Sequence, residues 1–414
     1  MKYILTFSFV LFSGLLFAQK LTEMQEPEYI KSVELRSLRS NSFLPIVKLG
    51  ASFIFKFDDT EGDQKEYHYK ITHCTYNWEN SNLSDTDFSN GFAEDRIRNY
   101  DNSFNTFLDY THYEVVFPNE QVQLKISGNY LLSIYDEYDE LIFTRRFVVY
   151  QPKVTIGVQV ATPRNINDLK TKQNVSFTIN HPNILFDNPS KEIKVALFQN
   201  MDWNSVITDL PPQYIRDSQL LYKYGDKTTY LGGNEFLFFD TKDYRVSTNN
   251  VRRTVLKDGI YHTRLYVDQT RANKPYTYYP DIDGNFVIRS LNTENPNIEA
   301  EYTKVHFFLD FLNPDDKEVF VYGAFNNWQL SDENKMYYNE ETKLYEASIL
   351  FKQGFYNYEY VTLDNNNKVD IAEINGSFYQ TENQYQVLVY YHKFGAKYDK
   401  VIGFGEGNSV QLQN

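Results

Sequence analysis

The residues that could carry out catalysis or bind a metal do not form a familiar motif in this sequence. Its 7 His residues include no His-x-His pair and no His-Glu-x-x-His, the spacings that place zinc ligands side by side. There is no Gly-x-Ser-x-Gly nucleophile elbow, and Gly232-Gly233 precedes a predicted strand instead of opening a phosphate-binding helix. No pair among the 55 Asp and Glu residues is marked out by its spacing. We therefore predict no catalytic residue, no cofactor and no metal site.

Two isolated features have chemical potential but a simpler structural interpretation. Asp281, Asp283 and Gly284 resemble the start of a calcium loop, but the distal Glu is missing, so a turn between strands is preferred. The single cysteine, Cys74, cannot form an internal disulfide. It lies in an alternating run next to His73, whose side chain points to the opposite face of a strand. We expect a buried strand residue instead of a reactive thiol.

A long connection between predicted strands, residues 77–109, carries residue types that anchor protein interfaces. Loops of this length are usually functional or mobile. The candidates for binding a partner are Arg96, Arg98, Tyr100, Phe104 and Phe107. The alternative is that the aromatic side chains cap the end of a sandwich while both arginines pair with acids.

The elements that must position these residues are predicted to be strands. Aromatic residues make up 17% of the chain, with 35 Tyr and 32 Phe, and both favour strands. Short alternating runs recur at 53–57, 66–76, 112–117, 129–135 and 141–150, the last two forming a hairpin around the turn at 136–140. Similar runs continue to the end of the chain, with prolines between them. The fold class is all-β, as tandem immunoglobulin-like β-sandwich domains.

Breaks in this pattern divide the chain. Residues 1–18 have a positive start, an apolar core and a small residue, Ala18, before Gln19, which is the pattern of a Sec-type signal peptide. Gln151-Pro152 ends the first strand series, and the polar stretch at 292–296 ends the second. The predicted domains are 27–150, a first β-sandwich; 151–293, a second; and 300–414, an early-set immunoglobulin-like domain.

The charge limits the partners. The formal net charge is −14 and no Lys/Arg cluster appears along the sequence, which argues against nucleic-acid binding. No apolar run after the signal peptide is long enough to span a membrane. We expect an exported protein that is monomeric on its own.

The C-terminal part is similar to early-set immunoglobulin-like modules of the glycogen-binding type. The matching residues are 323–328, Gly-Ala-Phe-Asn-Asn-Trp, and the run 354–360. In that family sugar stacks on two Trp residues beside a Lys. Trp328 matches the first Trp, but Glu359 occupies the Lys position, so Trp328 is interpreted as a remnant of a sugar-stacking site.

Most of the mature chain resembles the type IX secretion system plug protein family of Bacteroidota. The matching segments are 30–35, 43–46, 57–78, 91–111 with its Asp95-Arg96-Ile97-Arg98-Asn99-Tyr100 core, 125–150, 232–244 and 276–289. The resemblance implies a periplasmic protein, peripheral to the outer membrane, that docks on and occludes the periplasmic mouth of an outer-membrane β-barrel translocon. It implies no catalytic residues.

Two alternatives remain open at this point. One is a glycan-binding protein that uses the C-terminal domain, and the other is a hydrolase with an unfamiliar site. A sugar array distinguishes the first and a panel of generic substrates the second.

Overall fold

The structure is a computed structural model that describes residues 21–38, 43–248, 250–364, 366, 368–410 and 412. The described chain is mostly β, as its composition predicts, and each of its helices is about one turn long. The predicted signal peptide at 1–18 lies outside the described residues. Within the described ranges, no helix has the length and hydrophobicity needed to cross a membrane.

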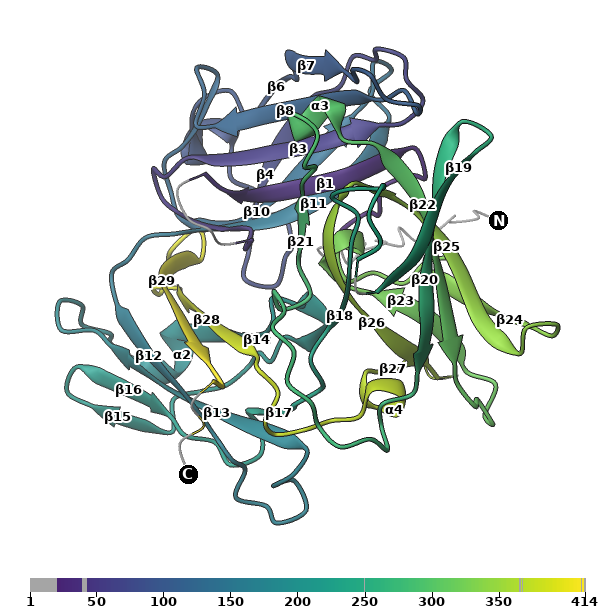
Figure 1. Ribbon diagram of the computed structural model, residues 1–414. Coiled ribbons are helices and arrows are strands. Elements are labelled where there is room, and N and C mark those ends of the chain that lie inside the picture. Colours follow the sequence, from purple (N-terminus) through teal and green to yellow (C-terminus); the bar gives the residue numbers. More distant parts are fainter. Residues whose placement is uncertain are drawn as a thin grey trace, which may run out of the picture.

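The first unit consists of two sheets, drawn in purple and blue at the top of Figure 1. Their strand orders are β1-β3-β8-β7 and β2-β11-β10-β4-β6, and β5 pairs separately with β9. Only β2 runs parallel to its neighbour in these two sheets of described strands. The bounds are β1 (Ile30–Ser37), β2 (Ile46–Lys48), β3 (Phe53–Asp59), β4 (His68–Cys74), α1 (Asp85–Phe88), β5 (Ser89–Gly91), β6 (Glu94–Arg96), β7 (Asn99–Asn102), β8 (Thr111–Phe117), β9 (Val122–Leu124), β10 (Gly128–Tyr135) and β11 (Leu141–Tyr150).

Aromatic rings fill the space between these two sheets. Because side chains alternate along a strand, Phe53, Phe55 and Phe57 all point from β3 to one face. They meet Phe147 and Phe143 of β11, with ring centroids 5.2 Å apart for Phe53 and Phe147 and 5.5 Å apart for Phe57 and Phe143. All five are buried, and each contributes roughly 1.5–3 kcal/mol by leaving water. The predicted hairpin of β10 and β11 is confirmed.

The second unit combines strands from two distant parts of the sequence, teal and yellow in Figure 1. One sheet has the order β12-β13-β16-β15, with β17 also on β13, and the other has the order β14-β28-β29. The bounds are β12 (Thr155–Ala161), β13 (Lys172–Asn180), α2 (Pro189–Glu192), β14 (Ile193–Gln199), the 3-10 helix η1 (Trp203–Ser205), β15 (Tyr214–Arg216), β16 (Gln219–Tyr222), β17 (Thr229–Leu231), β28 (Gln384–Tyr391) and β29 (Lys400–Asn408).

Glycines in β29 bring the two sheets of the second unit together. A Cβ on Gly405 would stand 2.6 Å from the Cβ of Ile156, and one on Gly403 would stand 2.5 Å from a methyl group of Val154. Such distances are shorter than normal carbon contacts. The alternate glycines therefore let β12 lie directly against the C-terminal strand.

The third unit is one continuously paired sheet of ten strands, green in Figure 1. Its order is β18-β26-β23-β24-β25-β22-β20-β19, with β21 and β27 also paired to β26. The sheet bends around a single core to which β18 to β20 and β22 to β26 all contribute. The bounds are β18 (Leu237–Asp240), β19 (Val251–Lys257), β20 (Ile260–Gln269), β21 (Phe286–Ile288), α3 (Pro296–Glu299), β22 (Tyr302–Asp310), β23 (Glu318–Tyr322), the 3-10 helix η2 (Ala324–Asn326), β24 (Lys335–Asn339), β25 (Leu344–Lys352), β26 (Gly354–Leu363), β27 (Val369–Asp370) and α4 (Ala372–Asn375).

The sheets cross the boundary that the sequence suggests between 293 and 300. Strands β18 to β21 come before that boundary but pair within the ten-stranded sheet. Strands β28 and β29 come after it but pair with β14. The polar stretch at 292–296 is thus a connection inside the third unit.

An apolar core joins the first and second units. Cys74, Tyr76 and Trp78 of the first unit pack in one cluster with Phe198 and Tyr390 of the second. The Tyr390 hydroxyl also donates a 2.9 Å hydrogen bond to Asn129 Oδ1. An interface between domains that is buried and apolar restricts their relative motion.

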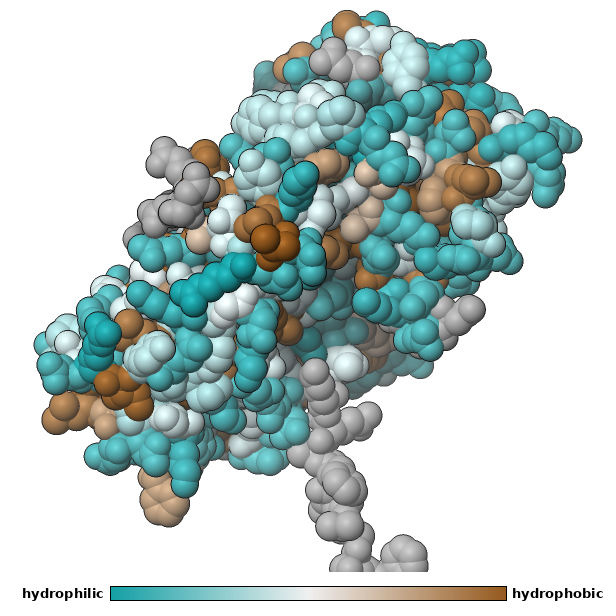
Figure 2. All heavy atoms as spheres, turned by 90° about the horizontal axis from the view of Figure 1, so that it is seen from below, coloured by the Kyte–Doolittle hydropathy of each residue, from teal (hydrophilic) through white to brown (hydrophobic). Residues whose placement is uncertain are grey.

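The outer surface has a different character. Seen from below, it is largely hydrophilic, with hydrophobic side chains in small scattered groups (Figure 2). Scattered apolar side chains are normal on a folded protein and do not by themselves mark a binding site.

Candidate partner-binding surface

The connection at 77–109 is not the open loop that its length suggests. It contains α1 and three short strands. Strand β6 extends one sheet of the first unit beside β4, and β7 extends the other sheet beside β8. The segment therefore crosses from one sheet to the other, and it divides the predicted partner-binding residues into two groups.

Arg96 and Arg98 form the first group, at the outer edge of the sheet that contains β6. Arg96 Nη1 lies 3.0 Å from Glu66 Oε2. Arg98 donates from Nη2 to Asp95 Oδ1 at 2.8 Å and from Nη1 to the other carboxylate oxygen. Both arginines thus pair with acids, as the alternative interpretation predicts, while their side chains remain 66% and 65% exposed.

The two arginines line an open depression of about 600 Å³. Its other walls are mostly charged, and the lining residues are Glu66, Tyr67, His68, Glu94, Asp95, Arg96, Arg98, Glu137 and Asp139. Exposed ion pairs of this kind contribute roughly 0–1 kcal/mol. The guanidinium groups are therefore held in place only by weak contacts.

Tyr100, Phe104 and Phe107 lie on the other side of the segment. Tyr100 packs on Tyr113, with ring centroids 5.7 Å apart. Phe104 and Phe107 are 66% and 55% exposed. The backbone N–H of Phe104 donates to the carbonyl of Ile298 at 2.8 Å. The segment thus contacts the third unit at this point.

A buried polar network lies beneath that contact and joins the first and third units. Asp58, which is fully buried, accepts hydrogen bonds of 2.6 Å from Lys352 Nζ, from the Tyr302 hydroxyl and from His112 Nδ1. Burial alone would raise the pKa of Asp58, but Lys352 and His112 together hold it below its usual value. The carboxylate is therefore ionised and matched by cations.

The junction between the second and third units has a different charge balance. Burial raises the pKa of Glu359 to about 8, against the attraction of Arg271, and raises the pKa of Asp202 to about 6. The Tyr322 hydroxyl of the third unit donates to Asp202 Oδ2 of the second at 3.0 Å. A cavity of about 330 Å³ lies here, lined by both acids.

More carboxyls with a raised pKa, buried or partly buried, lie close to this junction. Burial, together with the charge of Asp281, raises the pKa of Asp283 to about 7. Burial also raises the pKa of Glu235 to about 7, and Glu235 Oε2 has no hydrogen-bond partner among the described residues. We call Asp202, Glu235, Asp281, Asp283 and Glu359 the acid-rich junction.

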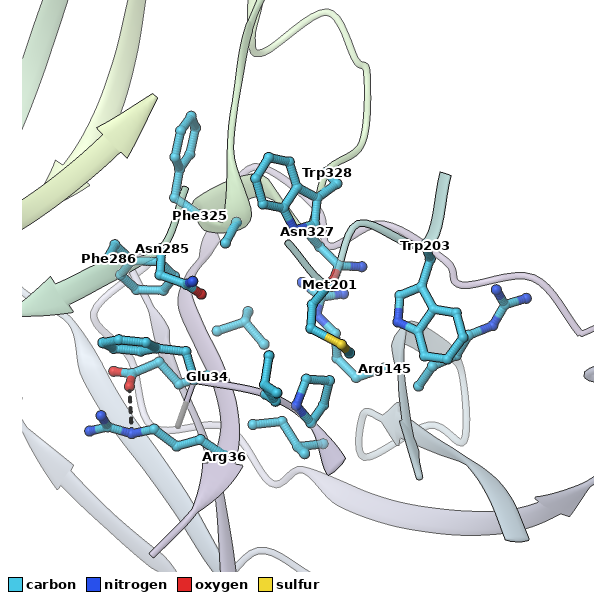
Figure 3. A pocket seen from close by; sticks show the side chains of 17 residues that line it. Glu34, Arg36, Arg145, Met201, Trp203, Asn285, Phe286, Phe325, Asn327 and Trp328 are labelled. Carbon is cyan, nitrogen blue, oxygen red and sulfur yellow. Dashed lines mark ion pairs between the residues drawn. The ribbon is translucent and has the colours of Figure 1, made fainter. Parts of the chain in front are cut away.

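All three units meet at a smaller cavity of about 90 Å³. Figure 3 shows Glu34 and Arg36 of the first unit on one side, Met201 and Trp203 of the second on another, and Trp328 of the third above them. Arg36 Nε lies 3.1 Å from Glu34 Oε2. The cavity is narrow, and its position between all three units makes it part of their packing.

Trp328 is part of that packing and is only 7% exposed. Its ring lies 5.1 Å from the ring of Tyr322 and 5.9 Å from that of Phe236. A sugar platform requires an open ring face. Trp328 offers none, which leaves the glycan-binding alternative without the residue on which it was based.

The remaining sequence features have structural roles. Asn285 donates its N–H to the carbonyl of Ile282 at 3.1 Å, closing a turn in which Asp283 and Gly284 have φ of 52° and 80°. Positive φ at both central residues is typical of a hairpin turn, so the turn prediction is confirmed. Cys74 is buried, as predicted, and burial raises the pKa of its thiol to about 12.

Sequence reasoning missed the buried carboxyls and their partners. Asp58 and Lys352 are far apart in the sequence, and neither has a neighbour that marks it as buried. The ion pair of Arg98 and Asp95, in contrast, joins residues three positions apart and can be predicted from the sequence.

Comparisons with known proteins were made by sequence and by structure. Residues 30–151 match the family model described as type 9 secretion system plug protein 1st domain. A crystal structure of a hypothetical protein from Parabacteroides merdae ATCC 43184 is similar at a TM-score of 0.90 and 32% identity, covering 94% of this chain and 100% of that one. No curated protein matches the chain.

Proposed function

The chain belongs to the type 9 secretion system plug protein family, and on that premise we propose that it is a non-enzymatic periplasmic protein that docks on the outer-membrane β-barrel translocon. Docked there, it occludes the periplasmic mouth of the translocon. The observation that carries the proposal is the family match over 30–151, the unit that also presents Arg96 and Arg98.

The architecture supports a role as a stopper. Such a protein must be wide and must keep its shape without a cofactor. Here an apolar core joins the first and second units, and the network around Asp58 joins the first and third. We interpret the first and second units as immunoglobulin-like sandwiches, because each has two main sheets, whereas the third unit is a single bent sheet and departs from the expected sandwich.

The depression around Arg96 and Arg98 is the proposed docking contact, and Tyr100, Phe104 and Phe107, on the other side of the segment, are candidates for a second contact. A plug must also leave, so its interface should be polar instead of a divided hydrophobic core. The two guanidinium groups satisfy this, because they are exposed and their present ion pairs are weak.

The test is a double substitution, Arg96→Ala with Arg98→Ala. Tagged protein is used to capture the translocon from detergent-solubilised outer membranes of the organism that encodes it. We expect capture to weaken by about 2 kcal/mol or more if the arginines are central contacts, while the melting temperature stays unchanged because exposed ion pairs add little stability.

The control is Arg216→Ala with Lys223→Ala, two exposed cations of the second unit without an ion pair among the described residues. It removes the same charge and should leave capture unchanged. A destabilised Arg96/Arg98 variant that is still captured would show that these arginines only brace the first unit.

A further inference from the structure

The outer face of the ten-stranded sheet gathers cations that are dispersed in the sequence. Arg253 of β19 pairs with Arg264 of β20, and Arg264 pairs in turn with His306 of β22. His262 of β20 pairs with Lys304 of β22. Residues directly opposite each other on paired strands share a face. We call Arg253, His262, Arg264, Lys304 and His306 the basic face.

This face is turned to solvent. Along β22, Val305 and Phe307 are buried in the core while Lys304, between Thr303 and Val305, is exposed. Arg253 and Arg264 are also exposed. The alternation along the strands therefore points these cations away from the interior.

The three strong cations of the basic face form no ion pair with any residue that the structure describes. No described acid lies within 4 Å of the charged groups of Arg253, Arg264 or Lys304. The guanidinium of Arg264 lies over the ring of Phe308 at 5.6 Å. The acid on the neighbouring β25, Glu346, already accepts hydrogen bonds from Thr342 and Asn339. Like charges directly opposite each other destabilise a sheet, so pairing Arg253 with Arg264 has a cost.

The histidines of this face share one hydrogen-bond chain. His262 Nδ1 lies 2.9 Å from His306 Nε2, and His306 Nδ1 lies 2.7 Å from Ser348 Oγ. Burial, together with His262, Arg264 and Lys304, lowers the pKa of His306 to about 4, against the opposing effect of Glu346. His306 is therefore neutral near pH 7, and the positive charge of the face comes from its arginines and its lysine.

The basic face ends at an unpaired strand edge. β19 pairs with β20 on one side and is the last described strand in the sheet order. It lies at the outer margin of the third unit in Figure 1. Val255 and Leu256 are exposed on it. An exposed edge presents N–H and C=O groups that can pair with another chain.

We infer that β19 accepts an extended acidic segment of a partner protein as an added strand, with the segment's carboxylates facing Arg253 of β19 and Arg264 of β20, while Lys304, one strand further from the edge, adds to the positive charge of the face. Main-chain hydrogen bonds give such a complex its affinity, and side chains alternating along the added strand give it specificity. Acidic residues at alternate positions fall on the same side as the cations. This surface belongs to the third unit, and the inference does not depend on the proposed docking of the first.

Charge complementarity singles out the acidic partner. The chain as a whole carries a formal charge of −14, so a group of unpaired cations is a local exception. Cations on an edge strand also discourage self-pairing. That competing role predicts self-association once the cations are removed and predicts no affinity for an acidic strand.

The probe is a fluorescein-labelled peptide of seven residues, the length of β19, with Glu and Val in alternation. Its counterpart has Lys in place of Glu. Fluorescence anisotropy should show binding of the Glu peptide alone, weakened by salt. The variant Arg253→Ala with Arg264→Ala should bind it about tenfold more weakly, and Arg216→Ala with Lys223→Ala should bind it as the unchanged protein does.

Two further arms test the mode of binding. Peptides N-methylated at either the odd or the even positions distinguish strand addition from surface attraction. In an added strand only alternate N–H groups pair with β19, so one of the two methylated peptides should lose binding and the other should keep it. Equal binding of both methylated peptides, or of the Lys peptide, would overturn the inference. So would binding to phosphatidylglycerol vesicles without binding to the Glu peptide.

Sedimentation addresses the competing role. If the protein binds no acidic peptide, and the Arg253/Arg264 variant self-associates, the cations only protect the edge and the inference fails. Because Arg253 and Arg264 are exposed and oppose each other, we expect the double variant to fold and to melt no lower than the unchanged protein.

Discussion

The third unit meets its two neighbours through interfaces of opposite charge balance. At its junction with the first unit, Asp58 is surrounded by Lys352, His112 and Tyr302, all within 2.6 Å. At the acid-rich junction with the second unit, carboxyls outnumber their cations, and Arg271 is the cation that acts on Glu359.

This difference determines how the stability of each junction depends on pH. An ionised carboxylate matched by cations needs no proton, so the Asp58 network holds at neutral pH. Burial disfavours the charged form of a carboxyl, so ionising a carboxyl whose pKa is raised by burial destabilises the folded chain. The junction of the second and third units should therefore respond to pH near neutrality more strongly than the Asp58 network, which we call the fixed junction.

The sharpest way to break the fixed junction is Lys352→Met. This substitution keeps the length of the side chain and leaves the buried charge of Asp58 without its lysine, with only His112 and the Tyr302 hydroxyl beside it. Removing one partner of a buried pair costs about 3–5 kcal/mol, so we expect a loss of that size in the free energy of unfolding, measured by urea denaturation.

Lys343→Met is the matched control, because Lys343 pairs with Glu340 on the surface and should change stability by less than about 1 kcal/mol. Adding Asp58→Asn to Lys352→Met should restore part of the loss, since the unpaired charge is then removed. Equal effects of Lys352→Met and Lys343→Met would mean that the first junction is no stronger than a surface contact.

The acid-rich junction is tested by Glu359→Gln. The pKa of Glu359 is raised from 4.5 to about 8 in the folded chain, so between these values folding binds a proton that the unfolded chain releases. Stability then falls as pH rises through this window, by about 1.4 kcal/mol per pH unit. The Gln variant lacks this titration, so its stability should fall less steeply up to pH 8 and exceed that of the unchanged protein there.

Urea denaturation at several pH values measures this slope, and Glu341→Gln, at an exposed position, supplies the control. Glu235 and Asp283 keep their own raised pKa values of about 7, so some slope remains in the variant. Parallel curves for the Gln variant and the unchanged protein would place the pH response elsewhere.

Local sequence signals predicted the strands but not their long-range arrangement. Alternating Phe residues at 53–57 and turn residues at 136–140 act over a few positions, and both predictions are confirmed. The pairing of β14 with β28 joins segments that lie before and after the third unit in the sequence. No local pattern in either segment predicts that the two pair. For the same reason a search along the sequence finds no Lys/Arg cluster, although Arg253, Arg264 and Lys304 share one face.

The proposed surfaces show the same limit. Arg96 and Arg98 drew attention because they are close in sequence and lie in a long connection, and the structure shows both paired with acids. Whether a cation is already neutralised depends on strands that meet only after folding. Sequence can therefore nominate a charged residue, but the charge that is available to a partner is a property of the fold.

The smallest effect on stability is expected from calcium. The calcium experiment tests whether clustered acids are neutralised by a bound metal ion or by protonation. Among the described residues, Asp59, Glu61 and Asp63 are the acids whose ligand oxygens lie within 4.8 Å of one another. Lys65 already occupies this group, with Nζ 3.0 Å from Asp59 and 3.7 Å from Asp63, so calcium would have to displace an ammonium group.

The acid-rich junction is no better suited to a metal ion. Asp281 already uses both carboxylate oxygens, accepting from the backbone N–H of Phe236 at 2.6 Å and of Asp283 at 2.8 Å. We therefore expect the melting temperature to be the same with EDTA and with about 1 mM calcium, a concentration that fills weak extracellular sites. A rise with calcium would show that a metal ion stabilises one of the two groups. Asp63→Asn and Asp283→Asn would then identify which, because only the variant at the true site would lose the rise.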